Sequence, residues 1–147
     1  MPEQTFHAGI KALLTNSKGE ILVLKSGPAE KKWVKRDFWD LPGGRIKKGQ
    51  SIEQTLEREV EEELGIPGKS VKIRGLFDAC ISNFYAHGKG KTRLLIITYK
   101  CTLHSNKKFK LSSEHSEWKW ASPKQAKKLL SDKFPKSLTN KLDSLKK

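Results

Sequence analysis

The sequence has 147 residues, of which 35% are hydrophobic and 31% are charged, and its formal net charge is +14. This balance excludes an intrinsically disordered chain and is typical of a soluble globular protein, which we expect to form one domain over residues 1–147. No apolar run approaches the roughly 20 residues that a membrane-spanning helix needs. The N-terminus lacks the basic start of a signal peptide.

The 30 lysines and arginines have two readings that the composition leaves open. They could attract an anionic substrate or a nucleic acid, or they could form an ordinary solvated basic surface, since many stand in scattered pairs such as Lys31-Lys32. Cys80 and Cys101 lack CxxC spacing and suit a reducing compartment, so we expect two buried free thiols in a cytoplasmic protein.

The first 50 residues predict strands separated by loops. Residues 6–25, FHAGIKALLTNSKGEILVLK, predict a β-hairpin with its turn at Asn16–Gly19. Residues 26–37 predict a polar loop that carries one aromatic residue, Trp33. The following WDLPGG ends any regular element, because it contains a proline and two glycines.

A helix is predicted to begin at residue 51, because Ser51 and Gln54 have the spacing of a capping box. Apolar residues then recur every four positions and give the helix a face to bury: Ile52, Leu56, Val60 and Leu64. Gly65 supplies the residue that ends a helix, and Pro67 prevents its continuation.

The second half of the chain returns to strands and ends in helices. Residues 71–81 and 92–103 predict strands joined by a loop at residues 82–91. A short strand at residues 116–122 places Trp118 and Trp120 on one face, where we expect core positions.

The C-terminal part predicts two helical segments. One begins with Ser122 as N-cap and Pro123 in its first turn. The other is an amphipathic segment at residues 135–145. Strands with interspersed helices, without regular βα repeats, predict a mixed α/β sandwich.

The helix at residue 51 is unusually acidic for a basic chain. Six glutamates fall between positions 53 and 63, and like charges four residues apart destabilise a helix by about 0.2–0.5 kcal/mol per pair. Glu59, Glu62 and Glu63 share one patch of helix surface, where Mg²⁺ would find the oxygen ligands that it prefers. The alternative to a metal site is a helix face whose acids are simply exposed to solvent.

The stretch from Gly44 to Ile66 resembles the Nudix box, G-x5-E-x7-R-E-U-x-E-E-x-G-U, where U is a bulky aliphatic residue. Gly44 matches the first glycine, and residues 58–66, REVEEELGI, match the second half without a gap. The flanking FHAGIKALL, WDLPGG and LSSEHSEWKWASPKQA are also similar to family members. The resemblance implies the Nudix fold, an α/β/α sandwich around a mixed β-sheet, with box 44–66 as loop, helix and loop.

The resemblance further implies hydrolysis of a pyrophosphate bond in a nucleoside diphosphate linked to another moiety, with Mg²⁺ or Mn²⁺ as cofactor. By motif position, Glu59, Glu62 and Glu63 would bind metal, and Glu59 or Glu62 would accept the proton of the attacking water. Arg58 would orient these carboxylates, and the two glycines Gly43 and Gly44 would shape the loop that faces the phosphates.

One box position departs from the pattern, because Gln50 stands where the family has glutamate. Glutamine keeps the size and an amide oxygen but loses the negative charge, which bears on metal affinity more than on the fold. The alternative function is therefore a non-catalytic Nudix-like domain that binds a nucleotide or RNA. A general nucleic-acid-binding protein is a third alternative, although the chain carries no recognisable RNA-binding signature.

Residues outside the box complete the candidate site. In some relatives a further ligand or base lies where Glu114 stands, and His115 beside it is interpreted as structural. Lys89, Lys91 and Arg93 could grip phosphates, although a solvated hairpin is the alternative that Gly88 and Gly90 favour. Phe84, Tyr85 or Trp33 could stack a base. Triphosphates, oxidised triphosphates, ADP-sugars and dinucleoside polyphosphates all stay open as substrates, as do a monomer and a homodimer.

Overall fold

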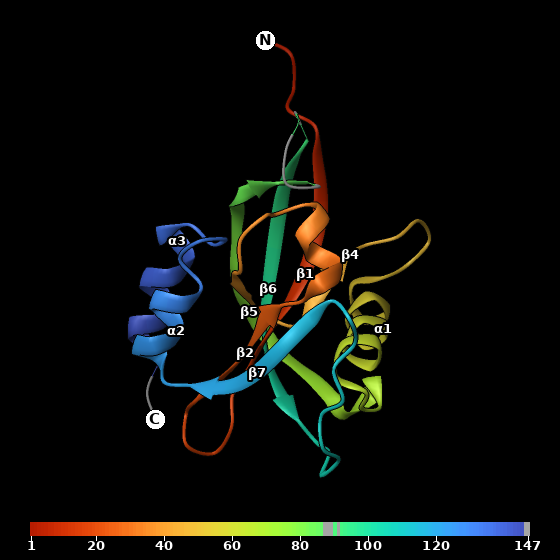
Figure 1. The fold of residues 1–147 in the computed structure, drawn as a ribbon, viewed down its shortest axis with the longest axis vertical. Coiled ribbons are helices and arrows are strands. Elements are labelled where there is room, and N and C mark those ends of the chain that lie inside the picture. Colours follow the sequence, from red (N-terminus) through yellow and green to blue (C-terminus); the bar gives the residue numbers. More distant parts are fainter. Residues whose placement is uncertain (87–89, 91, 146–147) are drawn as a thin grey trace.

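The computed structural model describes residues 1–86, 90 and 92–145, and its strands form two sheets (Figure 1). The larger sheet has the order β4-β1-β6-β5 and consists of β4 (Gly43–Arg45), β1 (Phe6–Leu14), β6 (Arg93–Leu103) and β5 (Val71–Tyr85). It is mixed, because β1 runs parallel to β6 while the other neighbours are antiparallel. The smaller, antiparallel sheet has the order β3-β2-β7 and consists of β3 (Trp39–Asp40), β2 (Ile21–Ser26) and β7 (His115–Ala121).

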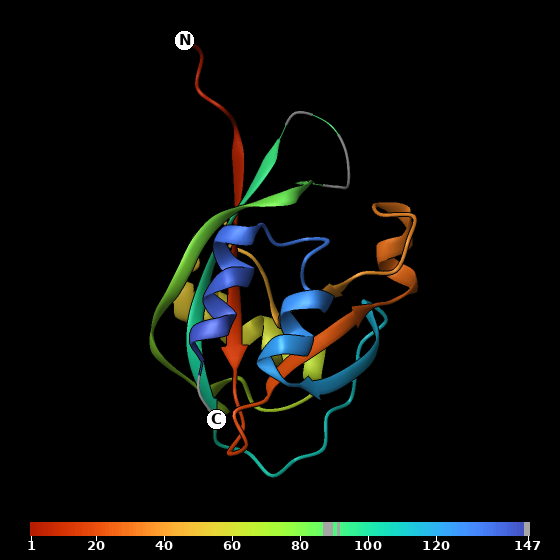
Figure 2. The same cartoon turned by 90° about the vertical axis from the view of Figure 1, so that its left-hand side faces the viewer.

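Helices cover the two faces of the strands. Helix α1 (Ile52–Leu64) packs on one face, and α2 (Pro123–Leu129), α3 (Lys136–Thr139) and the 3-10 segment η4 (Asn140–Ser144) pack on the other (Figures 1 and 2). Strand β2 serves both layers, because Leu22 and Leu24 join the core beneath α1 while Ile21 and Val23 join the core beneath α2. The predicted α/β/α sandwich around a mixed sheet is therefore confirmed.

The predicted helix ends are also confirmed. Ser51 and Gln54 exchange both capping-box hydrogen bonds at the start of α1, and Gly65 ends it with a left-handed φ of 66°. Ser122 and Gln125 form a second capping box at the start of α2. The last amphipathic segment is helical but divided between α3 and η4.

The predicted hairpin is wrong, although its turn is present. Asn16 closes the turn with hydrogen bonds to Lys18 and Glu20, yet β1 and β2 diverge into different sheets after the single bridge between Thr15 and Ile21. A strand has two edges, and β1 uses one for β4 and the other for β6. No edge of β1 is left for β2.

Three further expectations have different outcomes. Strand β5 extends to Tyr85, into the segment predicted as a loop. Of the two tryptophans predicted as core, Trp120 packs against the core beneath α1, but Trp118 is 39% exposed on the edge strand β7, where the ring of Phe109 contacts it edge to face. Both cysteines are buried and free, as predicted.

Among the described residues, no helix is long and apolar enough to cross a membrane.

Candidate functional site

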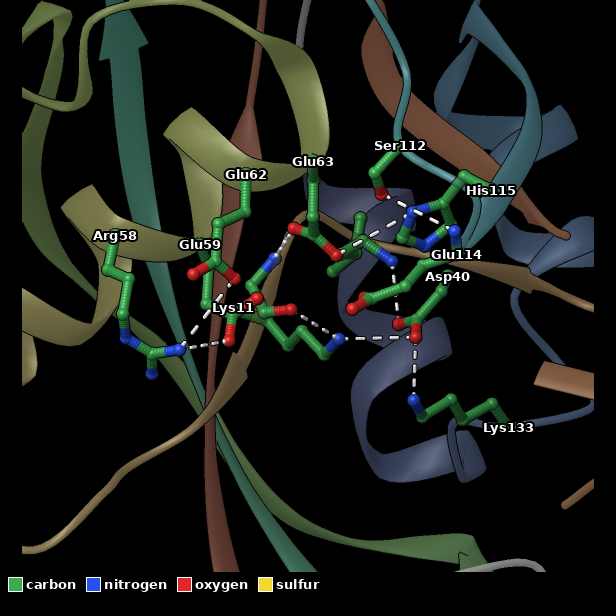
Figure 3. Close-up of polar contacts among 12 residues, drawn as sticks. Lys11, Asp40, Arg58, Glu59, Glu62, Glu63, Ser112, Glu114, His115 and Lys133 are labelled. Atoms are coloured by element: carbon green, nitrogen blue, oxygen red, sulfur yellow. Dashed lines mark hydrogen bonds and ion pairs between the residues drawn. The ribbon is translucent and has the colours of Figure 1, made fainter. Parts of the chain in front are cut away.

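The side chains of Glu59, Glu62 and Glu63 project from one side of helix α1 (Figure 3). Its apolar residues bury against the core, and this orientation carries Glu59 and Glu63 inward. Glu63 is only 2% exposed, whereas the Glu62 side chain is 54% exposed. Glu61 has a structural partner, because its carboxylate accepts a 3.1 Å hydrogen bond from the backbone N–H of Gly68.

The glycine turn before α1 fits closely around these acids. Gly43 has a φ of +138°, and a Cβ there would lie 2.0 Å from the carbonyl oxygen of Ile10. A Cβ on Gly44 would lie 2.3 Å from the carboxylate of Glu59. The N–H of Gly43 donates a 2.7 Å hydrogen bond to Glu63 Oε1. Glycine is therefore required at both positions if the turn is to touch the acids.

Arg58 holds the box together through three donors. Its Nη1 donates to Glu59 Oε1 at 2.9 Å, its Nη2 donates to the carbonyl of Arg45 at 3.1 Å, and its Nε donates to Gln50 Oε1 at 3.1 Å. Glu62 Oε2 lies 3.9 Å from Nη1. The amide oxygen of Gln50 thus accepts the hydrogen bond from arginine without supplying a negative charge.

Glu63 on α1 meets Glu114 and His115, and the ligand atoms of the three residues lie within 4.8 Å of one another. Glu114 and His115 reach this place from the segment that enters β7. Burial lowers the pKa of His115 to about 4, so its ring is neutral at pH 7, and its Nδ1 lies 3.7 Å from Glu63 Oε2. The contact is therefore not an ion pair at neutral pH.

Burial also acts on the two carboxyl groups of this cluster. It raises the pKa of Glu63 well above its usual value, against the opposing effects of Lys11 and the Gly43 N–H. Burial, with the nearby carboxylates of Glu59 and Glu30, likewise raises the pKa of Glu114. Negative charge at this cluster is therefore costly without a cation.

The residues of this cluster fit a divalent cation. His115 Nδ1 is buried and has no hydrogen-bond partner among the described residues. A buried unpaired nitrogen beside two carboxylates is costly in a protein interior, and a metal ion would satisfy all three groups. His115, interpreted from the sequence as structural, is buried, and its position also makes it a candidate ligand. Of the predicted ligands, Glu63 and Glu114 belong to the cluster, while Glu59 and Glu62 lie beside it on α1.

A buried chain of charges that sequence reasoning missed lies next to the acids. Asp40 Oδ2 accepts hydrogen bonds from Lys11 Nζ at 3.1 Å and from Lys133 Nζ at 2.6 Å (Figure 3). Lys11 also donates to the carbonyl of Gly43 at 3.3 Å, which links this chain to Glu63. Burial alone would raise the pKa of Asp40, but the two lysines outweigh it and hold the pKa below its usual range.

These groups line one pocket of about 360 Å³. Acids of the metal-site candidates contribute to its wall: Glu59, Glu62 and Glu63 from the box, and Glu114 from outside it. Five cations also line it: Lys11, Arg45, Lys47, Arg58 and Lys133. Trp33 and Leu94 supply apolar surface. The pocket can therefore hold a bound cation and an anionic ligand that carries an apolar ring.

Two of the predicted substrate-binding residues, Phe84 and Arg93, make contacts away from the described lining of this pocket. Phe84 packs edge to face on Phe38, with ring centroids 5.1 Å apart. Arg93 stacks on Tyr85 and donates to the carbonyl of Ser82, and neither Phe84 nor Arg93 is among the described lining residues. Lys89 and Lys91 lie outside the described residues. Gly43 and Gly44, in contrast, do line the pocket.

Comparisons with known proteins agree with this architecture. A family model described as the NUDIX domain matches residues 5–142. The MutT protein from Methanosarcina mazei Go1 has a similar structure, with a TM-score of 0.72 and 25% sequence identity over 98% of this chain and 95% of that chain.

Two relatives are similar in sequence. A protein named nucleoside triphosphatase NudI, from Escherichia coli O17:K52:H18, is 29% identical over 113 residues, which are 75% of this chain and 78% of the relative. A protein named 8-oxo-dGTP diphosphatase, from Buchnera aphidicola, is 37% identical over 68 residues, 46% of this chain. That match spans 47%, about half, of the relative's length.

Proposed function

The chain belongs to the NUDIX domain family, and from this premise we propose that it is a divalent-metal-dependent hydrolase of a nucleotide pyrophosphate bond. The substrate class is a nucleoside diphosphate linked to another moiety, most simply a nucleoside triphosphate. The names of the relatives NudI and 8-oxo-dGTP diphosphatase are consistent with this class.

One observation carries the proposal. Glu63, Glu114 and His115 place ligand atoms within 4.8 Å of one another in a pocket that also contains Glu59, Glu62 and five cationic side chains. Clustered carboxylates suit Mg²⁺ or Mn²⁺, and the cations suit phosphate oxygens. A solvated acidic surface does not explain Glu59 and Glu63, which are both buried.

Each residue has a distinct role in the proposed reaction. The bound cation would supply positive charge next to the phosphates and lower the pKa of a water. Glu63, Glu114 and His115 would hold it, with Glu59 or Glu62 completing the set. Glu62, the most exposed of these acids, is well placed to accept a proton from water. Arg58 keeps Glu59 oriented, and Gly43 and Gly44 shape the loop that would face the phosphates.

The proposal is tested by a phosphate-release screen of nucleoside triphosphates, ADP-ribose and diadenosine polyphosphates, with phosphatase added where the products need it. We expect turnover of one class in the presence of Mg²⁺ or Mn²⁺ and none in the presence of EDTA. Tight nucleotide binding without turnover of any compound would instead favour the non-catalytic binder. Equal binding of long RNA with and without the metal would favour the nucleic-acid-binding alternative.

A further inference from the structure

A hydrogen-bonded clamp fixes the turn that carries Lys133. Strand β5 breaks its register with β6 between Ile81 and Tyr85, and residues within this break face the turn at residues 131–134 instead. Ser82 Oγ and the Asn83 N–H both donate to the carbonyl of Lys133, each at 2.9 Å. The Asn83 side chain donates to three further carbonyls of that turn: Ser131, Asp132 and Phe134. The backbone of Lys133 is thereby held in place.

The side chain of Lys133 is fixed as well, but it keeps donors to spare. Its ammonium donates to Asp40 at 2.6 Å and lies 5.6 Å from the ring centroid of Phe38. An ammonium has three N–H donors, and the contacts within the described residues use one for a hydrogen bond. Lys11, by comparison, donates to both Asp40 and Gly43. Both lysines line the pocket, so Lys133 has the greater donor capacity left for a ligand.

The pocket that Lys133 lines also offers apolar surface that suits a nucleobase. The loop that carries Trp33 is tied to the Lys133 turn by the ion pair between Arg36 and Asp132 at 3.6 Å. Trp33 is 40% exposed and lines the pocket together with Leu94. Flat aromatic and aliphatic surfaces bind a ring, whereas the proposed cation site would take the pyrophosphate.

We propose that Lys133 is a specificity-determining residue that donates a hydrogen bond to a keto oxygen of the substrate's base. This inference rests on the proposed function, because it assumes a nucleotide in the pocket. Guanine carries the keto oxygen O6 and uracil or thymine carries O4, whereas adenine and cytosine carry an amino group at the matching position. An amino group at that position is a hydrogen-bond donor, as the ammonium of Lys133 is, so the two would not bond. The pocket therefore favours guanine and uracil nucleotides.

The test compares GTP, UTP, ATP and CTP, both as substrates and as non-hydrolysable α,β-methylene analogues in a calorimetric binding assay. We expect the wild-type protein to favour GTP and UTP by about tenfold, the scale of one hydrogen bond from a charged donor. In Lys133→Met this preference should fall to near unity. Lys133→Arg keeps donors and charge and should retain part of the preference, while the exposed-residue control Lys124→Met should retain all of it.

The possible results separate this inference from the proposed function. Turnover of all four nucleotides at equal rates by the wild-type protein overturns the inference and leaves the function standing. A keto preference in binding without any turnover overturns the function and leaves the inference standing. An equal loss for all four nucleotides in a folded Lys133→Met would assign Lys133 to a phosphate and overturn the inference. Binding of none of the four analogues overturns the inference, while turnover of ADP-ribose or a diadenosine polyphosphate would still support the function.

Discussion

Gly44 lies directly against the carboxylate of Glu59, so closely that a single added carbon at Gly44 would overlap it at 2.3 Å. The turn and the helix are therefore fitted to each other at the point where the pocket begins. Arg58 Nη1 donates a 2.9 Å hydrogen bond to the same carboxylate. The position of Glu59 thus depends both on the absence of a side chain at Gly44 and on the hydrogen bond from Arg58.

Gly44→Ala should reduce activity more than stability. The added methyl group would displace the end of the Glu59 side chain, which can rotate away, so the fold should persist while the acid leaves its position. We expect kcat/KM to fall by at least about tenfold, the scale of losing one charge-assisted contact. Steady-state kinetics and thermal unfolding of the same samples check this.

Gly49→Ala is the matched control for that substitution. Gly49 has a φ of +82° and no atom within 4 Å of its added Cβ, so alanine there meets strain without a clash. We expect a stability loss of about 1 kcal/mol with activity retained. If Gly49→Ala abolished activity and Gly44→Ala did not, the fit between the turn and Glu59 would have no functional meaning.

Gln50→Glu should leave the fold unchanged and strengthen metal binding. Its new carboxylate would take the place of the amide oxygen that accepts from Arg58 Nε and would add negative charge beside the cluster. Arg58 would then be shared with a second acid, leaving Glu59 freer to face a cation. Calorimetric titration with Mg²⁺ checks this, and unchanged or weaker affinity would refute it.

Local features of the sequence were sufficient to predict the helix, its caps and its acids. Ser51, Gln54 and Gly65 act within a few residues of one another, so their pattern is readable without the fold. Asp40 and Lys133 are 93 residues apart and meet only in the folded chain, where α2 packs against β2 and β7, so no spacing could reveal their contact. The hairpin failed for the same reason, because the choice between neighbouring strands depends on which edges of β1 are already paired.

Cys80 and Cys101 should be unreactive in the folded protein. Burial raises the pKa of each thiol to about 12, so at pH 8 both stay protonated and neither supplies the thiolate that attacks Ellman's reagent. Unfolding in urea should return both to ordinary pKa values and release two equivalents rapidly. Rapid reaction of the native protein would contradict this burial.

The same two thiols predict how stability changes in alkaline solution. Above the unfolded-state pKa of about 8.5 the unfolded chain loses protons that the folded chain keeps, so stability falls as pH rises from there towards 12. Urea unfolding at pH 7.5 and 10 checks the sign. A Cys80→Ala, Cys101→Ala double variant should show a smaller fall.

The C-terminal segment should be essential to the core. Leu142 is fully buried in the cluster that contains Phe134 and Leu138, so Leu142→Ala should lower the free energy of unfolding by about 2–5 kcal/mol. Leu145 is only partly buried, so Leu145→Ala is the matched control and should lower the free energy of unfolding by less than about 1 kcal/mol. Equal unfolding curves for the two variants would contradict this packing.

The measurement that tests the central claim most directly is metal-dependent turnover by Glu62→Gln beside Glu53→Gln. Both are exposed glutamates of α1, but Glu62 lines the pocket and Glu53 does not belong to the described lining. With the best nucleotide of the screen and Mg²⁺, we predict that kcat falls by at least about 100-fold in Glu62→Gln. Glu53→Gln should stay within about twofold of the wild-type protein, as expected for a surface substitution. Full activity in Glu62→Gln, or wild-type turnover that persists in EDTA, would contradict the account.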